Sequence, residues 1–196
     1  CIAAYHEWSF EQFHANRSSL YEVYMEEPLP NGKTERFYVV ESPIMAPQLA
    51  ARFPEIKTYL CQGIDDPSAT ARFDWNPNGF HAIILKSDSY IFIEPNLRGN
   101  TEQYIVYDAK DLPIPIDYKS CGLMQVANAA RTEPMAEVAS GTQLRTYRMA
   151  VCATGEFYAA NGSTVALALA AIVTILNQDI AIYEREVAVR FVLVEN

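Results

Sequence analysis

The chain has 196 residues, half of them hydrophobic, which is enough for one large domain or two small ones. Its formal net charge of −9 and its pI near 4.8 argue against a nucleic-acid partner, because few cations are available to neutralise phosphates. The longest apolar run, Val165 to Leu176, is too short to cross a bilayer and is interrupted by Asn177-Gln178-Asp179, so we expect no transmembrane segment.

The cysteines do not settle a redox compartment or a disulfide pairing. None of them forms a C-x-x-C pair, and their number is too small for a dense disulfide framework. Cys1 fits either the lipid-bearing first residue of a processed lipoprotein or simply the start of this polypeptide, and the second interpretation is favoured. The four positions are Cys1, Cys61, Cys121 and Cys152.

The first third of the chain predicts a short helix, a hairpin and a second short helix. Aromatic residues at helical spacing indicate a helix over residues 7–15. Residues 19–26 and 34–41 are rich in Tyr, Val and Phe, and Asn31-Gly32 between them suits a tight turn, so we expect a β-hairpin. Pro47 fits the first turn of a helix that Pro54 ends.

A meander of strands is predicted next, because short β-rich runs are separated by turn-forming residues without intervening helices. Ala71, Phe73 and Trp75 alternate with Arg72 and Asp74, which predicts one buried and one wet face. This spacing favours an antiparallel sandwich or a partly open barrel. The expected strands cover residues 57–62, 69–75, 80–86, 90–94 and 103–108.

The composition then changes, and we place a domain boundary at the change. Residues 111–117 are extended and stiffened by proline, and residues 128–143 are small, polar and contain Pro and Gly, as in a linker. We therefore predict a β-rich domain at residues 1–127, a linker at 128–143 and a separate unit at 144–196.

The last unit has the pattern of a β-α-β motif. Apolar runs at residues 147–153 and 187–194 flank a long helical pattern that follows Asn161-Gly162 and begins at a predicted N-cap, Ser163. The two strands should be parallel with a right-handed crossover, and their continuous apolar character predicts that both faces are covered. The helix places one apolar face toward the core, made of Val165, Leu169, Ile172, Leu176, Ile180 and Tyr183.

At these residues a family resemblance appears. The segments TYRMAVCATGEF and GSTVALALAAIVTILNQDIAIYEREVAVRFVLVEN resemble the opening of the catalytic domain of bacterial secreted reprolysin-like zinc metalloproteases, which are metzincins. Upstream phrases such as ESPIMAPQLAARFPEIKTY are similar to the propeptide of that family. The resemblance implies secretion or a cell-surface location, and a parent enzyme that hydrolyses peptide bonds with zinc. Overall it implies an α+β chain, with a mainly antiparallel prodomain before the start of a metzincin-like α/β catalytic domain.

The zinc-binding motif of that family, H-E-x-x-H-x-x-G-x-x-H, is not in this sequence. The histidines, His6, His14 and His81, are not paired at ligand spacing. We therefore expect no catalytic residues in this chain, no zinc bound by it alone and no activity of its own.

The segment Lys119-Ser120-Cys121-Gly122-Leu123 resembles the K-x-C-G-V cysteine-switch motif of adamalysin-type propeptides. A thiolate at Cys121 could fill the open fourth position of a catalytic zinc held elsewhere and displace the attacking water. Gly122, without a Cβ, would permit a close approach to the metal. The alternatives are that Cys121 is a buried free thiol or that it pairs with Cys61.

Other polar residues are weaker site candidates. We expect His81 to be a half-exposed strand residue, Asp65-Asp66 to form a solvated turn and Glu156 to hydrogen-bond locally. Three further acids, Asp108, Asp111 and Asp117, are too dispersed for a carboxylate pair.

Two functions from different classes follow. The favoured one is a proenzyme fragment whose prodomain inhibits the protease or assists its folding, with the remaining catalytic domain or a second copy covering an exposed edge at Val187–Val194. The alternative is a stand-alone extracellular β-rich module that binds a protein or a glycan.

Overall fold

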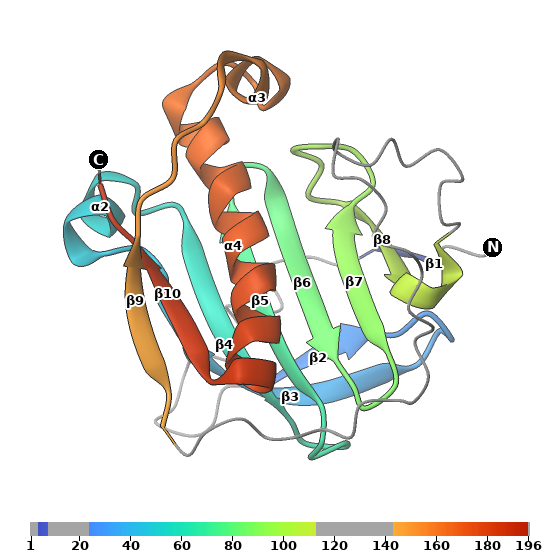
Figure 1. The fold of residues 1–196 in the computed structure, drawn as a ribbon. Coiled ribbons are helices and arrows are strands. Elements are labelled where there is room, and N and C mark those ends of the chain that lie inside the picture. Colours follow the sequence, from blue (N-terminus) through green and yellow to red (C-terminus); the bar gives the residue numbers. More distant parts are fainter. Residues whose placement is uncertain (1–3, 8–23, 113–142, 196) are drawn as a thin grey trace, which may run out of the picture.

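Strands dominate the first part of the chain and one long helix dominates the last (Figure 1). The computed structural model describes residues 4–7, 24–112 and 143–195. The elements up to residue 112 are β1 Ala4–Glu7, β2 Tyr24–Pro28, β3 Thr34–Glu41, α2 Pro47–Arg52, β4 Lys57–Gly63, β5 Thr70–Asn76, β6 Gly79–Leu85, β7 Tyr90–Pro95, β8 Gln103–Asp108 and the 3-10 helix η1 Ala109–Asp111. The later ones are β9 Arg145–Met149, α3 Gly155–Ala160, α4 Val165–Val187 and β10 Val189–Leu193. The mixed α+β class is confirmed.

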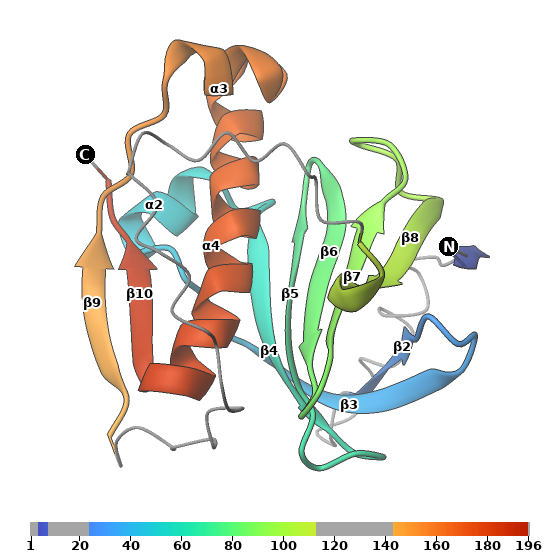
Figure 2. The ribbon, with the colours of Figure 1, turned by 45° about the vertical axis from the view of Figure 1, so that its right-hand side comes forward.

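The first eight strands form one antiparallel sheet in the order β1-β8-β7-β6-β5-β4-β3-β2. From β2 to β8 the strands follow the chain, as the predicted meander requires. The predicted hairpin is also present: Pro28 pairs with Thr34 across the turn, where Gly32 has a φ of +78°. The single sheet curves until it is nearly closed (Figures 1 and 2), which corresponds to the partly open barrel rather than to the two-sheet sandwich.

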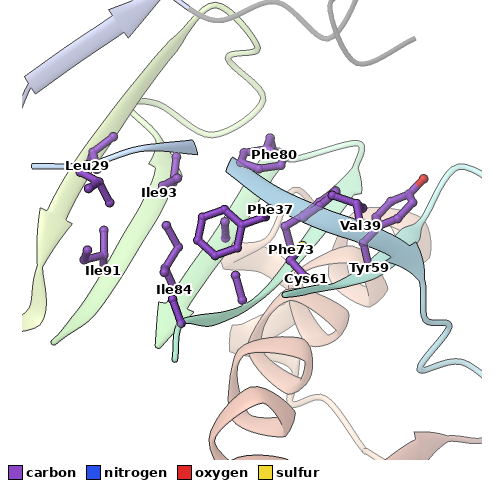
Figure 3. Packing of buried hydrophobic residues seen from close by; sticks show 14 of the residues in the cluster. Leu29, Phe37, Val39, Tyr59, Cys61, Phe73, Phe80, Ile84, Ile91 and Ile93 are labelled. Atoms are coloured by element: carbon purple, nitrogen blue, oxygen red, sulfur yellow. The ribbon is translucent and has the colours of Figure 1, made fainter. Parts of the chain in front are cut away.

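The inner face of the curved sheet holds the main hydrophobic core (Figure 3). Tyr59 stacks on Phe73 with ring centroids 4.5 Å apart, and Phe80 contacts Tyr104 edge to face at 6.0 Å. These residues alternate along their strands with the residues of the other face. The buried cluster consists of Leu29, Phe37, Val39, Tyr59, Cys61, Ala69, Ala71, Phe73, Phe80, Ala82, Ile84, Ile91, Ile93, Tyr104 and Val106.

The outer face of the sheet is covered at β5 and β6 by α4, which runs in front of β5 in Figure 1. The helix face expected to form the core is only partly buried: Ile180 is buried, but Val165 is 64% exposed and Tyr183 is 46% exposed. The prediction is correct in part, because Leu169, Ile172, Leu176 and Ile180 do pack in a hydrophobic cluster, together with residues of α2 and β10. The large sheet instead contacts Thr174, Asn177 and Ala181 of α4.

Strands β9 and β10 pair in parallel, with Tyr147 opposite Phe191, as predicted for a β-α-β unit. The expectation that both strands are covered on both faces was wrong, because β9 is exposed along most of its length. The open edge expected at Val187–Val194 is closed only at its end. Leu193 of β10 donates to the Ile44 carbonyl at 2.7 Å and accepts from the Ala46 amide at 2.8 Å, in an isolated bridge with Met45.

The predicted turn at Asn161-Gly162 is present, but the helix that follows begins one residue later than expected. Asn161 caps a short helix, α3, that the sequence did not predict. Ser163 has a φ of +55°, and the N-cap of α4 is Thr164, whose hydroxyl accepts from the Leu167 amide at 3.2 Å.

By length and composition alone, α4 is apolar enough to cross a membrane, with a mean hydropathy of 2.0 over its best window. The same composition suits a core helix. In this structure Ala170 and Val173 of α4 are fully buried, in a cluster that includes Leu49 and Leu193.

Candidate functional site

The side chains that β5 presents to α4 are polar, although they are buried. Strand alternation places Arg72, Asp74 and Asn76 on the helix side, opposite the core residues Ala71 and Phe73. These three polar residues are at most 4% exposed. The face of this strand that was predicted to be solvent-exposed is therefore buried, because α4, roughly a hundred residues later in the chain, covers it.

Arg72 binds three groups from distant parts of the chain. Its guanidinium donates to both carboxylate oxygens of Glu184 at 3.1 and 3.2 Å, to Asn177 Oδ1 at 2.9 Å and to Ser42 Oγ at 2.9 Å. Glu184 also accepts from Arg190 at the start of β10. The network therefore joins the sheet, the helix and the strand that follows it.

Burial and pairing act in opposite directions on the Arg72 cation. Burial lowers the pKa of its guanidinium, and the neighbouring Glu184 carboxylate opposes that shift. Arginine nevertheless stays protonated in proteins. A buried charge of this kind is tolerated only while its partners remain in place, since an unpaired one costs several kcal/mol.

A second polar cluster lies beside the first. Asp74 Oδ2 accepts from Asn76 Nδ2 at 2.5 Å and from Thr174 Oγ1 at 2.8 Å, and it lies 3.3 Å from His81 Nδ1. The other carboxylate oxygen of Asp74 is buried without a hydrogen-bond partner. Because Thr174 belongs to α4, this cluster is a second polar contact between the sheet and the helix.

An apolar groove of about 310 Å³ lies where α2, the first half of α4 and the end of β10 meet, and none of the residues of the two polar clusters lines it. Arg52 and Glu195, which form an ion pair, are among the residues that line it. Its apolar lining includes Leu49, Phe53, Val151, Val165, Leu169 and Ile172.

The residues of the predicted cysteine switch, Lys119, Cys121 and Gly122, lie outside the described residues, as do Asp117 and residues 128–142 of the predicted linker. Cys61 is a free thiol in the sheet core, so the structure does not show the alternative pairing of Cys121 with Cys61. Burial, together with the nearby Glu27, raises the pKa of the Cys61 thiol, which disfavours a reactive thiolate.

The acidic candidates have local roles. Asp65 pairs with Arg36, and Asp66 accepts from the Ser68 amide and hydroxyl; these bonds lower the pKa of both carboxyls. Glu156 lies in the first turn of α3, where hydrogen bonds to its own amide and to the Thr154 hydroxyl lower its pKa.

The two remaining dispersed acids are also accounted for. Asp108 caps η1 by accepting from the Lys110 amide, and it accepts from the Ser89 hydroxyl, while Asp111 is exposed in η1. Within the described part of the chain, no group of three or more His, Cys, Asp or Glu side chains is placed to hold a metal ion.

His81 is less exposed than expected, since its side chain is only 13% exposed and lies beside Asp74 and Thr174. No pattern in the sequence singled out Arg72 or Glu184. The only available signal was a polar residue, Asn177, inside an apolar helix. Comparisons with protein-family models and with curated proteins found no match.

Proposed function

We propose that this chain is part of the precursor of a secreted reprolysin-like zinc metalloprotease. In this account residues 1–127 form the prodomain and residues 144–196 begin the catalytic domain. The zinc and the glutamate base that would activate water belong to a part of the enzyme outside this sequence.

The observation that supports this function best is the buried polar contact between the sheet and α4. A prodomain that assists folding must hold the first elements of its catalytic domain in one pose. Arg72 does this with directional bonds to Asn177 and Glu184, which fix the position of the helix along the sheet more closely than apolar contact alone. The parallel pairing of β9 and β10 around α4 agrees with the start of an α/β domain.

Inhibition would come from Cys121. Its thiolate would take the fourth zinc position and exclude the water that serves as nucleophile. Cleavage in the region of residues 128–143 would then let the inhibitory segment leave the site.

The test is the latency of the longer polypeptide that includes the zinc-binding motif. Cys121→Ala should raise proteolysis before activation by at least tenfold, since a ligand to the metal is lost, whereas the neighbouring Ser120→Ala should leave it unchanged. A fluorogenic peptide assay on freshly purified precursor measures both. Equal latency of C121A and the unchanged precursor would remove Cys121 from the mechanism.

The alternative, a stand-alone binding module, required aromatic residues that face a partner or a glycan. Several aromatic residues of the sheet instead lie in the core, among them Phe37, Phe73 and Phe80. Exposed tyrosines are present, but Tyr38, Tyr147 and Tyr183 belong to three different elements, β3, β9 and α4.

A further inference from the structure

A polar cavity of about 290 Å³ lies between the large sheet and α4, and it shares no lining residue with the apolar groove. The sheet contributes His81 from β6 and Glu94 from the end of β7, and Arg98 follows in the loop to β8. The helix contributes side chains three and four residues apart, from Ala171 to Gln178, which places them on one face. The volume is that of roughly ten water molecules at about 30 Å³ each, so the cavity suits a small ligand.

Two residues that line the cavity have a buried amide atom without a partner in the described structure. Asn78 is 4% exposed, and its Nδ2 donates to the Leu167 carbonyl at 3.2 Å. That bond fixes the orientation of the amide and leaves Oδ1 as an acceptor without a donor. Gln178 is the opposite case, since its Nε2 is a donor without an acceptor. Because buried polar atoms are nearly always paired, two such atoms beside one cavity indicate a ligand or ordered water there.

The cavity also carries one charge of each sign. Glu94 Oε2 accepts from the Tyr107 hydroxyl at 3.2 Å, and Arg98 donates to the Ala160 carbonyl. Neither residue forms an ion pair within the part of the chain that the structure describes. Since a guanidinium has five donors and a carboxylate accepts several hydrogen bonds, both keep capacity for a ligand. A ligand with one positive and one negative group therefore complements the cavity better than a ligand with a net charge.

We propose that this cavity binds a zwitterion of dipeptide size. The ammonium of the ligand would pair with Glu94 and its carboxylate with Arg98. Its peptide N–H would donate to Asn78 Oδ1, and its peptide carbonyl would accept from Gln178 Nε2. A dipeptide supplies all four groups, whereas a free amino acid lacks the peptide bond. The inference does not depend on the proposed function, because these side chains have no part in latency.

The experiment titrates the ¹⁵N-labelled 196-residue chain with glycyl-glycine and with three analogues. Acetyl-glycyl-glycine lacks the ammonium, glycyl-glycine amide lacks the carboxylate, and δ-aminovalerate keeps both charges and the chain length without the peptide bond. Glycyl-glycine should shift the amide resonances of residues that line the cavity and leave those of the apolar groove unchanged. It should also bind at least tenfold more tightly than each analogue, because each one leaves a polar group of the site unpaired.

Matched variants assign the two charges. Glu94→Gln should make glycyl-glycine bind no more tightly than acetyl-glycyl-glycine, and Arg98→Gln should make it bind no more tightly than glycyl-glycine amide. Glu102→Gln and Lys33→Gln change the net charge by the same amounts at exposed sites elsewhere, and they should preserve the full preference. Circular dichroism should show that all four variants fold like the unchanged protein.

No shift at the cavity with glycyl-glycine, or equal binding of either capped analogue, would overturn the inference. Equal binding of δ-aminovalerate would do so too, because the two amide atoms would then be satisfied by water only. Each of these results would leave the proposed function standing, since latency depends on Cys121. Conversely, loss of the latency effect would not alter the binding of glycyl-glycine.

Discussion

Arg72 is the residue on which the contact between the sheet and the helix most depends. It is 1% exposed, and its partners lie 30, 105 and 112 positions away in the chain. A buried cation with hydrogen-bonded partners adds specificity more reliably than it adds stability. Removing the Arg72 side chain should therefore lower the free energy of unfolding, because its buried partners lose a hydrogen-bond donor.

We expect Arg72→Ala to lower the free energy of unfolding by about 3 kcal/mol or more, because the buried Asn177 loses its donor and Glu184 keeps only Arg190. Arg36→Ala removes an exposed pair with Asp65 and should cost at most about 1 kcal/mol. Urea denaturation measures both. If R72A does not fold, Glu184→Gln offers a milder test of the same contact, and equal losses for R72A and R36A would contradict the account.

The carboxyl of Glu27, in β2, is buried beside the apolar core of the sheet. It is 2% exposed, and burial raises its pKa from 4.5 to about 8. Between pH 4.5 and about pH 8, the folded chain therefore keeps a proton on Glu27 that the unfolded chain releases. Since the unfolded state then binds fewer protons, stability falls as the pH rises.

Relative to Glu27→Gln, the unchanged protein should therefore lose stability from pH 5 to pH 8, by up to about 1.4 kcal/mol for each pH unit. Urea denaturation at pH 5, 6.5 and 8 measures the difference. Glu41→Gln, at an exposed position on β3, is the control and should leave the pH dependence of the unchanged protein intact. Parallel pH profiles for the unchanged protein and E27Q would show that Glu27 does not titrate in this range.

At the scale of elements, local patterns predicted most of the described sheet. Alternation and turn residues located the strands from β3 to β8 to within two residues, and apolar spacing located α4. The six-residue helix α3 was not predicted, because so short an element has no periodic face to recognise.

The errors came from packing between distant segments, which local patterns do not contain. Arg72 and Asp74 alternate with apolar residues, as the solvent-exposed residues of a strand do. Only the packing of α4 against them buries that face. The apolar face of α4 was only partly predicted for the same reason: the sheet contacts the polar Thr174 and Asn177, while Val165 of the predicted face remains exposed. The proposed cysteine switch remains a sequence-based hypothesis, because Cys121 is not among the described residues.

Across the protein, the antiparallel sheet and the β9-α4-β10 unit should unfold together, as one cooperative unit. Two parallel strands and one helix are too little to form an independent core. Their second hydrophobic cluster is shared, since Ile44, Leu49 and Ile56 from the sheet region pack with Val173 and Ile180 of α4. The polar contacts of Arg72 then select one pose for the helix.

Native-state amide hydrogen exchange tests this requirement most directly. In the unchanged protein, amides of α4 between Ala170 and Ala181 should exchange with the same free energy of opening as those of β5. In Arg72→Ala the α4 amides should open at lower free energy than those of β5, while Arg36→Ala should keep the two equal. Opening of α4 independently of β5 in the unchanged protein, or no change in R72A, would contradict the claim that the sheet holds the helix.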